Sequence, residues 1–274
     1  MSMRRQGIGL LRFGLVTMGI LVLTSITIEA TNGLAGSRTM LAVVAEWWLA
    51  PECASDTVAV RVAGETWCVD TFPAAPGPGC PYQTISSHIQ TTENVATSGC
   101  EPIVTAGVSP WTFVARHHAV QLCARAGRTL LPGEIWYQAA LGTPSDRACH
   151  TNNSQVRVNE ESDCRSAVGA FDMVGNVWEL VDNEAVDGQI NDIVLPETGY
   201  VAAVSSGGWP IESTTELNEF FAGDYVWNQG MGTSAVMRGG FHRSRDDAGV
   251  YSVHAAVAPD FTGGATGFRC GYRL

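Results

Sequence analysis

The sequence has little positive charge. It contains 16 Lys and Arg residues against 27 Asp and Glu, a formal net charge of −11, and no basic cluster occurs beyond the extreme N-terminus. Nucleic-acid-binding surfaces are basic, so this balance argues against a nucleic-acid partner. It also disfavours adsorption on anionic lipid headgroups. The acidic balance favours solubility and the attraction of cations.

No apolar run reaches the roughly 20 residues of a typical membrane-spanning helix. The run at 13–28 comes close and follows Arg4 and Arg5, an order that directs the downstream chain outward. Residues 1–35 are therefore either a cleaved signal peptide or an uncleaved signal anchor. Residues 36–50 are then a linker, and 51–274 form a domain exported to the periplasmic or extracellular face.

Cysteine patterns typical of metal or redox sites are also missing. None of the 8 cysteines forms a Cys-x-x-Cys pair, which excludes zinc ribbons and thioredoxin-like centres. An even count behind an export signal indicates disulfides, but the count leaves their pairing open. Cys149–Cys164 would cross a polar loop, and nearness in sequence suggests Cys53–Cys68 and Cys80–Cys100.

Regular secondary structure is predicted to be sparse. The 30 glycines and 8 tryptophans indicate a loop-rich fold with large aromatic anchors. The pattern favours an α+β class, because a few helices are mixed with short strands. The predicted strands are 57–62, 66–70, 235–238, 250–257 and 267–273, the predicted helices are 118–126 and 132–140, and the predicted loops are 141–167 and much of 182–232.

Four segments, in order, carry a resemblance to a known family. They are WCVDTF (67–72), SPWTFVARHHAVQLCARAGRTLLPGEIWYQAA (109–140), FDMVGNVWEL (171–180) and MRGGF (237–241) with GFRC (267–270). Together they resemble the formylglycine-generating enzyme family, also called the sulfatase-modifying-factor domain. The resemblance spans about residues 50 to 274. It implies the C-type-lectin-like fold, behind the N-terminal hydrophobic helix.

The resemblance also implies a structural calcium ion on the loop that carries FDMVGNVWEL. Its ligands would be the side chains of Asp172 and Glu179 and the backbone carbonyls of Gly175 and Val177. This set suits a hard cation, which binds several oxygen atoms. The alternative is an ordinary loop with two solvated carboxylates and Trp178 packed in the core.

The resemblance further implies a disulfide between Cys123 and Cys270. It also indicates that this chain lacks the active-site cysteines of the family. The family's oxidase binds copper(I) through two cysteines shortly after its RGG element. Those positions hold Ser244 and Gly249 here, and no cysteine lies between Cys164 and Cys270. A hydroxyl and a hydrogen cannot replace two soft thiolates, so we expect neither copper nor the copper-oxidase activity.

Two classes of function follow from these observations. The first is a non-catalytic exported module that binds a protein or glycan, or serves as an accessory subunit of a membrane complex, tethered through 13–28 if that segment is uncleaved. The second is an enzyme with altered, non-copper chemistry in the same cleft; a diversified display protein is a weaker alternative. The candidate binding residues are His242, Arg243 and Asp246 in HRSRDD (242–247), and Trp209 and Trp227 in the long loop. A solvated loop and ordinary core packing are the respective alternatives.

Overall fold

The computed structural model describes residues 52–145 and 148–274, nearly all of which belong to one unit, Cys53–Leu274. The predicted signal or anchor at 1–35, its apolar run at 13–28 and the linker at 36–50 lie outside the described residues. Among the described residues, no helix is both long enough and apolar enough to cross a membrane.

The predicted hairpin is present at the start of the domain. Strands β1 (Thr57–Val62) and β2 (Glu65–Asp70) pair antiparallel across a two-residue turn, Ala63 and Gly64. Both turn residues have positive φ, the backbone that matches the twist of a tight hairpin. Strand β15 (Cys270–Arg273) joins β2, and β5 (Thr129–Leu130) completes a four-stranded sheet in the order β1-β2-β15-β5. The end of the chain therefore pairs with the first hairpin of the domain.

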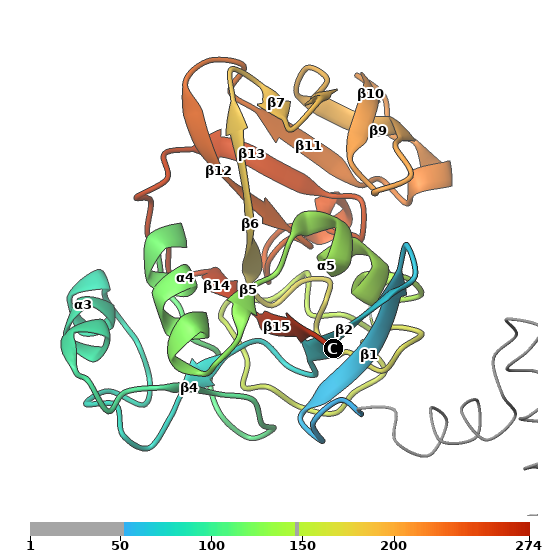
Figure 1. The fold of residues 1–274 in the computed structure, drawn as a ribbon. Helices are drawn as coiled ribbons and strands as arrows, with labels where there is room; N and C mark the ends of the chain where they lie inside the picture. The colour runs from blue at the N-terminus through green and yellow to red at the C-terminus, as the bar shows by residue number, and fades with distance from the viewer. Residues whose placement is uncertain (1–51, 146–147) are drawn as a thin grey trace, which may run out of the picture. The chain divides into compact units, whose positions relative to one another are not determined.

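A second, mixed sheet contains nine strands in the order β10-β9-β11-β13-β12-β6-β7-β8, with β14 paired to β6. In Figure 1, most of it lies above the helices. Its strands are β6 (Trp178–Val186), β7 (Gln189–Ile190), β8 (Ile193–Val194), β9 (Gly199–Val204), β10 (Pro210–Thr214), β11 (Tyr225–Asn228), β12 (Thr233–Arg238), β13 (Val253–Val257) and β14 (Thr266–Phe268).

The expectation that 182–232 is largely loop was wrong. This stretch contains the end of β6 and all of β7 to β11. The strands are short, and β11 pairs in parallel with β13, which is distant in sequence. Such strands are stabilised by neighbours rather than by a local alternating pattern, so periodicity did not reveal them. The strands predicted at the C-terminal end are present as β12, β13, β14 and β15.

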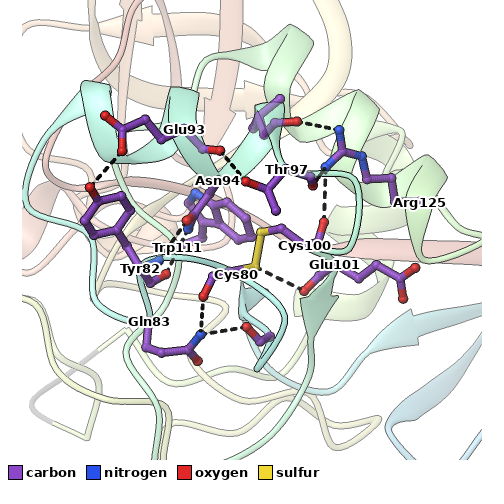
Figure 2. Close-up of a disulfide and its surroundings, with 12 residues drawn as sticks. Cys80, Tyr82, Gln83, Glu93, Asn94, Thr97, Cys100, Glu101, Trp111 and Arg125 are labelled. Atoms are coloured by element: carbon purple, nitrogen blue, oxygen red, sulfur yellow. Dashed lines mark hydrogen bonds between the residues drawn. A yellow bond between two sulfur atoms is a disulfide. The ribbon is translucent and has the colours of Figure 1, made fainter.

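Helices cover part of this framework. Helix α4 (Arg116–Arg125) begins two residues before its prediction, and α5 (Gly133–Ala140) follows Pro132 as predicted. Helix α3 (His88–Ala96) was not predicted, and it ends at a cluster of carbonyl groups. Figure 2 shows Arg125 of α4 donating to the carbonyls of Thr97 and Cys100 there, beside the Cys80–Cys100 disulfide. The short pair β3 (Ala75–Pro76) and β4 (Pro102–Ile103) and the 3-10 turns η1 (Glu219–Phe221) and η2 (Arg245–Asp247) complete the elements.

All eight cysteines are in disulfides, in the pairings suggested by the sequence or by the resemblance. The bonds are Cys53–Cys68, Cys80–Cys100, Cys123–Cys270 and Cys149–Cys164. Cys123–Cys270 joins α4 to β15 across 147 residues of sequence. Four disulfides in one domain indicate an oxidising compartment outside the cytosol.

Candidate functional site

The arginine of the RGG segment is a buried structural cation. The guanidinium of Arg238 lies 4.7 Å from the ring centroid of Trp209 and 5.2 Å from that of Trp136, within cation–π range. It also donates to the carbonyls of Gly133 and Gly208. Burial lowers the pKa of Arg238 to about 10, so it remains charged at neutral pH. Arg238 therefore links β12 to α5 inside the core.

A second buried cation joins the FDMVGNVWEL and GFRC segments. Nη2 of Arg269 lies 2.7 Å from Oε1 of Glu179, and its Nε lies 2.9 Å from Oε2. The indole Nε1 of Trp136 donates to Oε2 of Glu179 at 2.6 Å. Arg269 also donates to the carbonyls of Asp70 and Phe171. The motifs behind the family resemblance thus meet as a satisfied polar network in the core, which strongly couples these segments.

The two carboxylates that were expected to bind calcium have different surroundings in the structure. Both oxygens of Glu179 accept hydrogen bonds from Arg269 or Trp136, so Glu179 does not fit as a cation ligand. Asp172 is 6% exposed, and no hydrogen bond or ion pair of its carboxylate is formed with another described residue. Its pKa is raised to about 7, chiefly by burial and in part by the Glu179 carboxylate, although the charge of Arg269 opposes the shift. An unpartnered buried carboxylate suits a cation.

Calcium on this loop stays a prediction, with Asp172 and the carbonyls of Gly175 and Val177 as the ligands that fit. In the part of the chain that the structure describes, no group of three or more His, Cys, Asp or Glu side chains is placed to hold a metal ion. Any calcium here would accordingly depend on backbone oxygens as well as on Asp172.

Two glycines carry the chain from β12 into the HRSRDD segment. Gly239 and Gly240 have φ values of +88° and +82°, a region that favours glycine. A Cβ on Gly239 would lie 2.4 Å from the carbonyl oxygen of Met173, and one on Gly240 would lie 2.4 Å from the Cβ of Ala248. The sharp turn therefore requires glycine, and it presents residues 241–247 at one end of the large sheet.

A pocket lies beside this turn. It has a volume of about 450 Å³, within the range of about 300–1,000 Å³ of small-ligand sites. Aromatic side chains from four different segments form its walls. They are Trp178 of β6, Trp227 of β11, Phe241 after the glycine turn and Phe261 after β13.

The aromatic walls stand at different angles to one another. The ring planes of Trp178 and Trp227 are 89° apart, with centroids 5.5 Å apart. His254 stacks on Trp227 at 5.5 Å, and Phe261 is 42% exposed although it borders the pocket. Burial lowers the pKa of His254 to about 4, so the imidazole is neutral at physiological pH. The inner wall is consequently apolar and uncharged.

The charged groups of the pocket are Arg243 and Asp247, one of each sign. Neither side chain forms an ion pair or hydrogen bond with another described residue. Burial raises the pKa of Asp247, and the neighbouring Asp246 carboxylate raises it further. The pocket therefore has a charged donor group and a charged acceptor group free for a ligand, in addition to the hydroxyl groups of Ser244 and Thr266 in its lining.

Ser244 and Gly249, the two positions that the resemblance aligns with cysteines, are packed against neighbouring groups. Oγ of Ser244 accepts from the backbone N–H of Phe241 at 3.0 Å. A Cβ on Gly249 would lie 1.8 Å from Oδ1 of Asp224, so the Asp224 carboxyl group fills the space that a side chain would need. That Oδ1 has no hydrogen-bond partner among the described residues, whereas Oδ2 accepts from the N–H of Tyr251 at 2.7 Å.

The predicted binding residues fall into different places. Trp227 lines the pocket, as does Arg243, whereas Asp246 is exposed on η2 outside the pocket lining. Trp209 follows the alternative of core packing, because it is fully buried against Arg238 and donates to Glu134. His242 is also buried, and its ring contacts the carbonyl of Asn176.

Sequence reasoning did not single out several pocket residues. Phe241 was noted only as part of a motif and Trp178 only as a core residue, and neither His254 nor Phe261 was considered as a binding residue. The available signal was the repeated placement of aromatic residues next to glycine-rich turns, as in RGGF and FTGG. Their convergence depends on the pairing of β6, β11, β12 and β13, which the sequence did not reveal.

No protein-family model matches the sequence, and no curated protein is significantly similar to it. Among solved structures, the Major Tropism Determinant U1 variant matches 82% of this chain and 55% of its own, at 15% identity and a TM-score of 0.42. Treponema denticola variable protein 1 matches over 81% of this chain and 94% of its own, at 11% identity and a TM-score of 0.42. PvdO from Pseudomonas aeruginosa matches over 80% and 90%, at 13% identity and a TM-score of 0.41. The chain spans about half the length of the Major Tropism Determinant chain.

Proposed function

We propose that this chain is a non-catalytic exported binding module that holds its ligand in the aromatic pocket beside residues 241–247. The observation that carries the proposal is the pocket itself. It combines aromatic walls with two oppositely charged groups, Arg243 and Asp247, that have no protein partner. Mostly apolar walls with a few convergent polar groups are typical of ligand sites.

The turn beside the pocket supports a non-catalytic role. Ser244 is buried and accepts a hydrogen bond from the backbone N–H of Phe241, and the space at Gly249 is filled by Asp224. Neither position supplies a thiolate, and copper(I) binding in this family depends on two of them. Binding without copper-dependent oxidation is therefore the activity that these side chains support.

We also propose that the chain belongs to the formylglycine-generating enzyme family and has its C-type-lectin-like fold. In this proposal Asp172 binds calcium, and the chain is tethered through 13–28 as an accessory subunit of a membrane complex. Tethering is tested by mild detergent extraction from native membranes followed by mass spectrometry. An intact N-terminus with a stoichiometric partner supports it, whereas a processed protein without partners contradicts it.

Ligand-observed NMR tests the pocket directly. A library of ring-containing fragments is screened against the full chain, its Trp227→Ala variant and an Ile89→Ala control. Ile89 is 57% exposed on α3, and it is not part of the pocket lining. We expect fragments that bind the wild type and the control, and an affinity loss of about tenfold or more in Trp227→Ala, which is about 1.4 kcal/mol.

Two results would overturn the proposal. The first is that no fragment binds the folded wild type, and the second is that bound fragments are unaffected by Trp227→Ala. Far-ultraviolet circular dichroism and thermal unfolding of each variant show whether the fold is intact, so that lost binding is not confused with lost structure.

A further inference from the structure

We infer that the pocket takes a neutral polyhydroxylated ring, such as one pyranose unit of a glycan, and binds it directly rather than through a metal ion. The inference rests on the proposed binding function and specifies the chemistry of its ligand. Three features of the pocket carry it: its flat aromatic walls, its balanced charges and its supply of free hydrogen-bonding groups.

The walls fit a ring with an apolar face. Trp227 is partly exposed, the buried Trp178 packs against it at 89°, and the exposed ring of Phe261 lines the same pocket. A pyranose has a face of C–H groups that can pack on an aromatic ring by dispersion and by burial of apolar area. The pocket volume of about 450 Å³ is compatible with a single ring and part of a neighbouring unit.

The charges of the pocket favour a ligand without net charge. Its lining contains one cation, Arg243, and one anion, Asp247, while His254 is neutral. The whole HRSRDD turn is similarly balanced, since Arg245 and Asp246 offset each other, although the chain carries −11 overall. An anionic ligand would leave Asp247 repelling it, and a cationic ligand would be repelled by Arg243.

Hydroxyl groups match the free donors and acceptors. A hydroxyl both donates and accepts, so neighbouring hydroxyls can donate to the Asp247 carboxylate while accepting from the Arg243 guanidinium. Hydrogen bonds to charged groups are stronger than neutral ones, which offsets the desolvation of the two side chains. Asp247 is the one carboxylate in the lining, too few for a sugar held through a calcium ion.

The experiment is a titration of the full chain, followed by tryptophan fluorescence and ligand-observed NMR. The probes are methyl pyranosides of glucose, galactose and mannose and N-acetylglucosamine. Matched probes are L-phenylalanine as a zwitterion, tetramethylammonium as a cation and glucose 6-phosphate as an anion. We expect saturable binding of at least one neutral pyranoside, with the charged sugar weaker by about tenfold or more.

The variants separate the role of each group. Trp227→Ala, Arg243→Ala and Asp247→Asn should each weaken pyranoside binding by about tenfold or more, whereas Ile89→Ala should leave it unchanged. If tetramethylammonium or phenylalanine binds in a Trp227-dependent manner and no pyranoside does, the inference is overturned while the binding function stands. If none of the probes binds and the fragment screen also finds nothing, both are overturned.

Discussion

At the residue scale, Asp224 makes a pH-dependent contribution to stability that can be measured. Its carboxyl is 1% exposed, and burial raises its pKa to about 7 from an ordinary value of 3.8. The charged Arg238 and the backbone N–H groups of Tyr251 and Ser252 oppose this shift without reversing it. The folded protein consequently holds the Asp224 proton more tightly than the unfolded chain does.

The sign of the effect follows from that difference. A raised folded-state pKa gives a contribution that is fully present below the unfolded pKa, near 3.8, and is lost as pH rises through about 7. Asp224→Asn keeps a neutral group of the same shape at every pH. The free energy of unfolding of the wild type, relative to Asp224→Asn, should fall between pH 4 and pH 7 by up to about 1.4 kcal/mol per pH unit.

Chemical denaturation of both proteins at several pH values gives this difference, and it cancels the titration of other groups such as His254. A matched control is Ile89→Ala, because this exposed side chain does not titrate and its loss should give a nearly constant difference across the same range. A difference between wild type and Asp224→Asn that does not change with pH would contradict a protonated Asp224 in the folded state.

At the scale of elements, sequence reasoning found those that are stabilised locally. The hairpin of β1 and β2 was predictable because its alternation and its turn lie within one short stretch. Helices α4 and α5 were predictable because their buried residues, including Ala119, Leu122 and Cys123 in α4, recur on one face. These elements carry their own signals, so no distant partner was needed to recognise them.

The elements that were not predicted from the sequence are stabilised by contacts with other parts of the chain. Helix α3 contains several weak helix formers, including Thr91, Thr92 and Asn94, and is held by the Cys80–Cys100 disulfide and by Arg125. Strands β7 and β8 have two residues each and exist through pairing with β6 and with each other. The pocket depends on pairing among β6, β11, β12 and β13, which are far apart in the sequence, and this explains why only part of its lining could be predicted.

Two of the disulfides are expected to stabilise the domain to different extents. Cys123–Cys270 closes 147 residues, and Cys80–Cys100 closes 20. On the chain-entropy model these loops correspond to about 5 and about 3 kcal/mol of stabilisation. We therefore expect replacement of Cys123 and Cys270 by alanine to lower the free energy of unfolding by more than replacement of Cys80 and Cys100.

Chemical denaturation measures both losses, in a buffer without reductant so that the remaining disulfides stay intact. Hydrogen exchange adds a second readout, because loss of Cys80–Cys100 should expose amides of α3 before the rest of the domain opens. Equal losses in the two variants, or the larger loss in the Cys80 and Cys100 variant, would contradict this order.

At the scale of the whole molecule, two buried arginines hold the sheets and helices together. Arg269 connects β14 and β15 to β6 through Glu179, and Arg238 connects β12 to α5 and to the loop at Gly208. The guanidinium of Arg269 already neutralises the carboxylate of Glu179, which the family resemblance assigned to calcium. The long polar loop that leads to Asp172 is tied separately, by Cys149–Cys164 and a few backbone bonds.

Calcium removal tests whether Asp172 or Glu179 binds a metal ion. If Asp172 binds calcium, the ion should stabilise the fold by about 2.7 kcal/mol at one hundred times its dissociation constant, and thermal unfolding with calcium or a chelator measures the shift. Asp172→Asn should abolish this calcium response. Glu179→Gln should lower stability in both conditions, because it breaks the pair with Arg269, yet it should keep the response. A wild-type melting temperature that does not change with calcium would reject calcium binding. Loss of the calcium response in a folded Glu179→Gln variant would assign Glu179 to the metal, and it would contradict the pairing of Glu179 with Arg269.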